Sequence, residues 1–78
     1  MGISEKIRIL MIKRGISKAT ELAGKLQEAG FAMTKQNLSN KLKRGTFSDE
    51  ELQGIAAALG AKYTKKEYFT LDDTGEEV

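Results

Sequence analysis

Hydrophobic residues in the first fifteen positions recur at intervals of three and four. This spacing puts three of them on one face of a helix: Ile7, Leu10 and Met11. It predicts an amphipathic helix over about 5–14, with Ser4 as its N-cap and Gly15 as its left-handed stop. Ile9 and Ile12 widen the apolar surface, so we expect this helix to be covered on more than one side.

A second apolar stripe lies in the segment 17–30, SKATELAGKLQEAG. Its members again follow helical spacing: Ala19, Leu22, Ala23 and Leu26. They predict a helix that ends near Ala29, with Gly30 just beyond it. The small side chain of Ala23 suits a close crossing of two helices. In the connection that follows, Phe31 and Met33 are expected to be tucked into the core.

The third helical segment, TKQNLSNKLKRG, is much less apolar. Thr34 is its expected N-cap, and Leu38 and Leu42 are its only apolar anchors. The side chains directed away from Leu38 are amides and cations: Gln36, Asn40, Lys43 and Arg44. Flanking positions are also polar: Lys35, Asn37 and Ser39. A helix that only fills a core carries more apolar residues, so this outward face is a candidate functional surface, although an ordinary polar surface helix has a similar pattern.

The last helix and the tail complete the predicted architecture. Ser48 and Glu51 form a capping box ahead of an apolar stripe that ends at Gly60, and Phe47 is placed to pack under the helix start. A strand is expected over about 67–71, paired with 62–64 through a turn at Lys65-Lys66, and followed by a turn over 72–75.

These elements predict a mainly α fold of four or five helices with a short C-terminal β-strand or hairpin. Residues 1–60 would form the helical domain and 61–78 an extension whose last residues, 76–78, are expected to be disordered. A lone hairpin is only marginally stable in water. It must therefore pack on the helices or pair with the same strand of a second molecule.

Charge is distributed unevenly along the chain. Residues 1–44 carry ten Lys and Arg against three Glu, a balance of +7, whereas residues 45–78 carry three Lys against eight acids, a balance of −5. A basic surface attracts polyanions. An ordinary solvated surface on which charge happens to be unevenly distributed has the same composition. Together with the polar third helix, however, the asymmetry favours nucleic acid as the partner.

Composition excludes several kinds of chemistry. The chain has no Cys and no His, which rules out disulfides, thiolate or imidazole metal sites, and Ser-His or Cys-His catalysis. The acidic clusters at 49–51 and 72–73 lie where a helix and a turn favour acids, without a basic or nucleophilic partner. We therefore expect no enzyme, metal or cofactor. No stretch approaches the roughly 20 apolar residues of a membrane span, and we expect a cytoplasmic protein.

Four short segments carry a resemblance to a known family: ELA at 21–23, TKQNLS at 34–39, KRG at 43–45 and IAAALG at 55–60. In this order they resemble the Cro/repressor type of helix-turn-helix, the lambda-repressor-like DNA-binding domains. Small uncharacterised bacterial and phage proteins of that fold are also similar. The connection between the second and third helices is about five residues longer than in the family, a departure that affects the crossing angle of the two helices.

The resemblance implies a sequence-specific transcriptional regulator of the phage or mobile-element repressor type, which inserts the helix at about 35–43 in the major groove of double-stranded DNA. It implies that three side chains read bases: Lys35, Gln36 and Asn40. It implies that six residues contact the phosphate backbone: Lys18, Thr34, Asn37, Ser39, Lys43 and Arg44. Such repressors bind near-palindromic sites as dimers. We expect a homodimer, through a C-terminal strand containing Tyr68, Phe69 and Leu71.

Two alternatives stay open at the level of sequence. The first is a protein-interaction module of the same fold that no longer reads DNA and holds a partner with its acidic, aromatic tail. The longer connection supports this alternative, and the positive balance of residues 1–44 argues against it. The second is binding to structured RNA. No small-molecule ligand is implied by the sequence.

Overall fold

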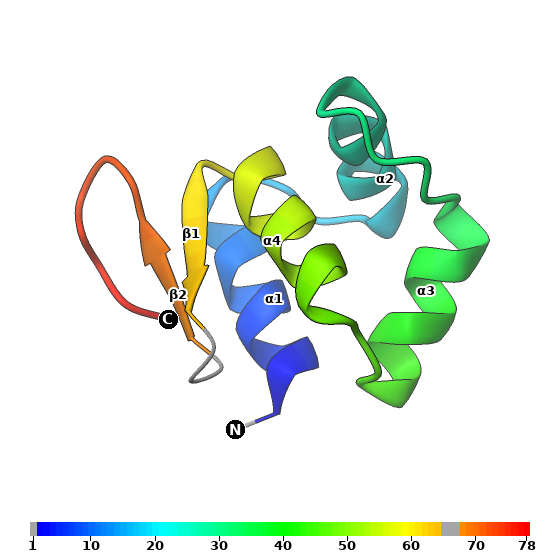
Figure 1. Cartoon of the computed structure of the whole chain (residues 1–78), viewed down its shortest axis with the longest axis horizontal. Helices are drawn as coiled ribbons and strands as arrows, with labels where there is room; N and C mark the ends of the chain where they lie inside the picture. Colours follow the sequence, from blue (N-terminus) through cyan, green and yellow to red (C-terminus); the bar gives the residue numbers. More distant parts are fainter. Residues whose placement is uncertain (1, 65–67) are drawn as a thin grey trace.

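The computed structural model describes residues 2–64 and 68–78 and consists of four helices followed by a β-hairpin (Figure 1). The mainly α class with a C-terminal hairpin is confirmed. The predicted turn at Lys65-Lys66 lies outside the described residues. In chain order the elements are α1 (Ile3–Lys13), α2 (Ala19–Glu28), α3 (Lys35–Arg44), α4 (Asp49–Ala58), β1 (Ala61–Thr64) and β2 (Tyr68–Leu71).

One hydrophobic core joins the helices to the hairpin. Its largest fully buried side chains come from α1, α2, α3, α4 and β2: Phe69, Ile7, Leu10, Leu22, Leu26, Leu38 and Ile55. α1 and α4 lie in the middle of the molecule, with the hairpin on one side and α2 and α3 on the other (Figure 1). The two outer parts are therefore attached to a common centre.

α1 begins earlier than the sequence predicts. Its N-cap is Gly2, in extended conformation, and the helix starts at Ile3, which packs against the core. Ser4 thus lies inside the first turn and is not the N-cap. Its Oγ is buried and forms no hydrogen bond with a described residue. The apolar contact of Ile3 explains why the helix extends past the expected cap.

The covering of α1 also differs from the prediction. Ile7, Leu10 and Met11 are buried, but Ile12 is 72% exposed. The prediction that Ile12 forms part of a surface covered by other elements is wrong, because none of the described elements packs over this side of the helix. The C-terminal end of α1 agrees with the prediction, since Gly15 adopts the left-handed conformation.

The connection from α2 to α3 opens with a Schellman motif. α2 ends at Glu28, near the predicted position, and Gly30 adopts a φ of 90°. The Phe31 N–H donates to the Leu26 carbonyl at 2.8 Å, and the Gly30 N–H donates to the Gln27 carbonyl at 3.0 Å. These bonds stabilise the longer α2, so the additional residues of this segment extend a helix and form a short loop.

The two apolar residues of this connection have different environments. Met33 is buried, as predicted, but Phe31 is 37% exposed, so its prediction as a core residue is wrong. The Phe31 ring lies over Gly54 of α4, where an added Cβ would be 2.8 Å from a ring carbon. Because Gly54 has no side chain, the ring can rest against α4 without entering the core.

The hairpin packs on the helices, one of the two arrangements expected from sequence. Its strands are antiparallel, from the pair Ala61↔Leu71 to the pair Thr64↔Tyr68. Phe69 is fully buried, and its ring centroid lies 5.3 Å from that of Tyr63. β2 contacts α1, and β1 contacts α4.

The C-terminal residues 76–78, expected from sequence to be disordered, pair with the outer edge of β2. The Phe69 N–H donates to the Val78 carbonyl at 3.2 Å, and the Val78 N–H donates back to the Phe69 carbonyl at 2.8 Å. The Leu71 N–H donates to the Glu76 carbonyl at 2.9 Å. This edge of β2 is thus occupied by the chain itself.

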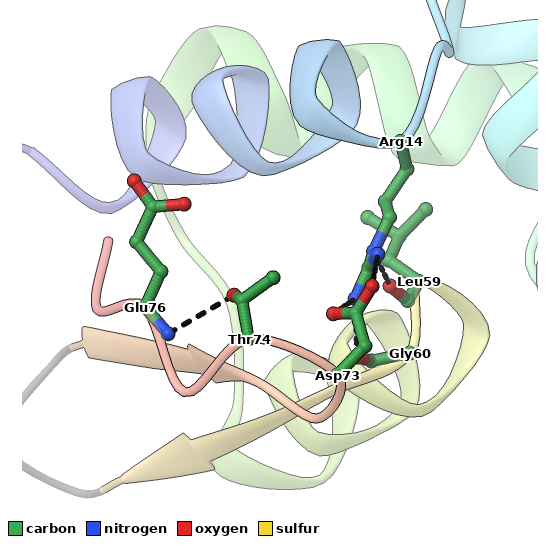
Figure 2. Close-up of polar contacts among 6 residues, drawn as sticks. All are labelled: Arg14, Leu59, Gly60, Asp73, Thr74 and Glu76. Atoms are coloured by element: carbon green, nitrogen blue, oxygen red, sulfur yellow. Dashed lines mark hydrogen bonds and ion pairs between the residues drawn. The ribbon is translucent and has the colours of Figure 1, made fainter.

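Arg14 joins three segments that are distant in sequence (Figure 2). Its Nε and Nη2 donate to the carbonyls of Leu59 and Gly60 at 2.7 and 2.8 Å, capping the end of α4. Its Nη1 and Nη2 also donate to the two carboxylate oxygens of Asp73 at 2.9 and 2.8 Å. The bidentate hydrogen bonds from Arg14 lower the pKa of Asp73 from 3.8 to about 2.

Candidate nucleic-acid interface

α3 owes its shape to local signals at both ends. The Thr34 hydroxyl accepts a hydrogen bond from the Asn37 N–H at 3.2 Å, which confirms the predicted N-cap. Gly45 ends the helix in the left-handed conformation. Between these ends only Leu38 and Leu42 are buried. The helix is therefore attached to the core by one narrow side, and its other sides are open.

The structure places the predicted α3 site residues on those open sides. Six of the seven are exposed, and Ser39 is half-buried. At about 100° per residue, Gln36, Asn40 and Arg44 lie opposite the side anchored by Leu38. The α3 side chains predicted to contact DNA are these: Lys35, Gln36, Asn37, Ser39, Asn40, Lys43 and Arg44. Lys35 and Ser39 lie on one edge of the helix, away from the centre of the outward face.

The fourth cation of α3, Lys41, has a structural partner. Its Nζ lies 2.9 Å from a carboxylate oxygen of Glu51 in α4. Burial raises the pKa of Glu51, but the hydrogen bonds from the Ser48 N–H and from Lys41 outweigh it and lower that pKa overall. The Glu51 carboxylate also completes the predicted capping box with Ser48. Lys41 therefore links α3 to α4.

Lys35, Lys43 and Arg44 differ from Lys41 in this respect. Among residues 2–64 and 68–78, no acidic side chain lies within ion-pair distance of these three cations. Their charges are exposed to solvent and not neutralised locally. Amide side chains can pair with base edges and cationic side chains can contact phosphates, so this face has groups of both kinds.

Acids of the C-terminal segment lie at the other end of the molecule. Glu76 pairs with Lys13 at 2.7 Å, and Asp73 pairs with Arg14 at 2.8 Å. Both cations belong to the end of α1, on the hairpin side, whereas α3 lies at the opposite end of the long axis (Figure 1). Two cations of residues 1–44 are thus paired near the hairpin, and one cation of α3, Lys41, is paired with Glu51.

Lys18, the predicted phosphate contact outside α3, lies at the start of α2. It is the N-cap residue of that helix, in extended conformation and exposed. Its neighbours Ser17 and Ala19 line a groove that Ser39 and Lys43 of α3 also line. The start of α2 and α3 therefore line the same groove. The predicted phosphate contact at Lys18 and those on α3 thus belong to one region of the surface.

Arg8 is a residue of this region that sequence reasoning missed. It is exposed, lies on α1 and lines the same groove. From the sequence, α1 is expected to have only a structural role. The sequence of an amphipathic helix does not show which other elements its charged residues will lie beside. Only the tertiary arrangement, in which α1 and α3 line the same groove, brings Arg8 into this part of the surface.

The proposed dimer surface is where the structure disagrees most with the sequence. Phe69 and Leu71 are buried in the core, and Tyr68 is half-buried. Since the outer edge of β2 is also paired with residues 76–78, these side chains do not form an exposed interface. The homodimer stays a prediction, without this surface.

The described part of the chain contains no group of three or more acidic side chains placed to hold a metal ion. None of its helices has both the length and the apolar character that crossing a bilayer requires.

Comparison with known proteins identifies a family. A family model described as Domain of unknown function (DUF6471) matches residues 2–64, which include all four helices and β1. Searches of curated proteins and of solved structures gave no match. Because the family model covers most of the sequence, the chain belongs to the DUF6471 family.

Proposed function

We propose that this protein is a sequence-specific DNA-binding regulator of transcription, of the lambda-repressor-like helix-turn-helix type, found in phages or other mobile elements. The observation that carries the proposal is the outward face of α3, with exposed amides and cations that lack acidic partners among the described residues. In this proposal α3 enters the major groove of double-stranded DNA.

The roles of the side chains follow their positions. Gln36 and Asn40, opposite the buried side of α3, pair with base edges, joined by Lys35 from the first turn. Lys43 and Arg44 contact phosphates, as do Lys18, Thr34, Asn37 and Ser39. The Thr34 hydroxyl accepts the N-cap bond through a lone pair, so its proton remains for donation to a phosphate oxygen.

A homodimer is part of the proposal, because one short helix offers few base contacts. Two copies on a near-palindromic site double those contacts and set the spacing of the half-sites. The surface that joins the copies lies outside the buried side chains of β2.

The competing proposal, a protein-interaction module, depended on the tail. Phe69 is in the core, and two of the tail acids, Asp73 and Glu76, pair with α1. The tail therefore lacks the exposed aromatic surface that this alternative requires, and we favour DNA.

The first test is binding to random-sequence duplex DNA at several salt concentrations, measured by fluorescence anisotropy. We expect the affinity to fall steeply with salt, with a slope of about 0.9 per phosphate contacted. Lys43→Gln and Arg44→Gln should each reduce that slope by about 1. Lys62→Gln, an exposed cation on β1, is a control for net charge and should change the slope much less.

Two results would contradict the proposal. The first is no binding at low salt, and the second is equal effects of the α3 and β1 variants. Competition with structured RNA separates the remaining alternative, since tighter binding to RNA than to duplex DNA would reassign the surface. After selection of an operator, Gln36→Ala with Asn40→Ala should cost about 1–3 kcal/mol of discrimination per lost bidentate pair. Thermal stability should be nearly unchanged, because both residues are exposed.

A further inference from the structure

A groove of about 450 Å³ lies between α1, the start of α2 and α3. Its floor is apolar and consists of Met11, Ile16 and Leu42, each of which is mostly covered by the rest of the protein. This volume is within the range of about 300–1,000 Å³ that is usual for small-molecule sites. The proposed base contacts of α3 do not use the apolar floor of this groove.

One wall of the groove is Ile12, which is 72% exposed. An exposed aliphatic side chain beside an apolar floor forms a continuous apolar surface that binding to a hydrocarbon group would remove from water.

The polar and charged side chains among the residues that line the groove are all suited to an anion. Arg8 and Lys43 contribute positive charges, and Ser17 and Ser39 contribute hydroxyls. No acidic residue lines the groove, and neither cation forms an ion pair within the described part of the chain. The complementary ligand therefore carries a negative charge on an apolar body.

We propose that this groove binds a small amphipathic carboxylate, that is, an aliphatic or aromatic monocarboxylic acid. Its hydrocarbon part covers Met11, Ile12, Ile16 and Leu42, and its carboxylate pairs with the cations of Arg8 and Lys43. An inorganic phosphate has no apolar part to cover Ile12. A peptide would bring backbone polar groups onto the apolar floor, where two hydroxyls cannot satisfy them.

Occupation of the groove opposes DNA binding, a consequence that rests on the proposed function. Ser39 and Lys43 line the groove and are also proposed phosphate contacts. A carboxylate paired with Lys43 withdraws that cation from the phosphate backbone. By linkage, the factor by which the ligand weakens DNA binding equals the factor by which DNA weakens ligand binding.

The test uses octanoate, titrated into the ¹⁵N-labelled full chain and followed by amide chemical shifts. We expect saturable shifts concentrated at Met11, Ile12, Ile16 and Ser17. Acetate has the charge without the chain, and octylammonium has the chain with the opposite charge, so both should bind much more weakly. Equal binding of octylammonium, shifts spread over the whole surface, or failure to saturate would each overturn the proposal.

Variants separate the groove from general charge effects. Arg8→Glu should weaken octanoate binding by about fivefold or more, since it replaces an attractive charge by a repulsive one. Ile12→Ser should weaken it through loss of the apolar wall, and both residues are exposed, so the fold is retained. Lys62→Glu on β1 makes the same change in net charge outside the groove and should have little effect. Equal weakening by Lys62→Glu would overturn the assignment of the site.

A last measurement distinguishes failure of this proposal from failure of the proposed function. Saturating octanoate should lower the affinity for duplex DNA in wild type, and the effect should be lost in Arg8→Glu. Octanoate binding without any DNA binding would reject the proposed function and retain the groove. DNA binding that octanoate does not affect would reject the coupling.

Discussion

Arg14 is the residue on which the arrangement of three segments depends, since its side chain extends from the end of α1 and its guanidinium contacts the end of α4 and the tail. The Asp73 carboxylate accepts two hydrogen bonds from it and must be ionised to do so. Because the folded protein lowers the pKa of Asp73 to about 2, folding favours the charged form.

The pH dependence follows from that direction. Above the ordinary pKa of 3.8 the contribution of Asp73 to stability is complete, and it is lost as the pH falls through about 2. We expect Asp73→Asn to be less stable than wild type near neutral pH and the difference to shrink progressively below about pH 4. Urea unfolding at a series of pH values measures this, and a difference that stays constant down to pH 2 would exclude the mechanism.

Ser4 provides a second prediction for a single residue. Its buried Oγ has no hydrogen-bond partner among the described residues, so burial of the hydroxyl is uncompensated. Ser4→Ala should raise the free energy of unfolding by about 1 kcal/mol. If Ser4 were the N-cap, the same change would instead cost about 1 kcal/mol. The sign of the change in chemical denaturation therefore decides between the two.

At the scale of elements, the connection from α2 to α3 depends on a contact between Phe31 and Gly54. Glycine inside a helix costs about 1 kcal/mol relative to alanine, so Gly54→Ala gains that amount unless its Cβ displaces the ring. An added Cβ would lie 2.8 Å from a ring carbon of Phe31. The packing of the Phe31 ring against Gly54 thus offsets the cost of having a glycine inside α4.

A double-mutant cycle measures this compensation. In wild type, Gly54→Ala should be neutral or destabilising, whereas in Phe31→Ala it should stabilise α4 by about 1 kcal/mol. The four unfolding free energies therefore give a coupling of about 1 kcal/mol or more. Additivity of the two substitutions would show that the ring moves away from the added Cβ without loss.

The helices and their connections also show how much of the fold and of the candidate site can be predicted from the sequence. The Thr34 cap, the Ser48 capping box and the stop at Gly30 are confirmed, since each depends on groups within a few residues. The open sides of α3 also follow from its short apolar stripe. Ile12 and Phe31 were mispredicted because their exposure depends on which distant elements pack beside them. The groove could not be predicted for the same reason, since residues of three elements line it.

At the scale of the whole molecule, the hairpin is part of the core and not an appendage. Phe69 is fully buried against the helices, so removing its side chain should cost about 3–5 kcal/mol. This is a large share of the stability of a domain of 78 residues. Thermal unfolding of Phe69→Ala should therefore occur at a much lower temperature. Tyr68→Ala on the same strand is half-buried and serves as the control, with a smaller effect expected.

The separation of charge has a consequence for how the molecule would approach a polyanion. The cations of α3 that have no acidic partner among the described residues lie at one end of the 30 Å long axis of the molecule (Figure 1). If the proposed function holds, the field of a DNA duplex would attract this end of the molecule and favour approach with α3 toward the duplex before any contact forms. Encounters in the reversed orientation would lack this attraction, so under the proposed function the position of these cations would favour the productive orientation as well as a faster association.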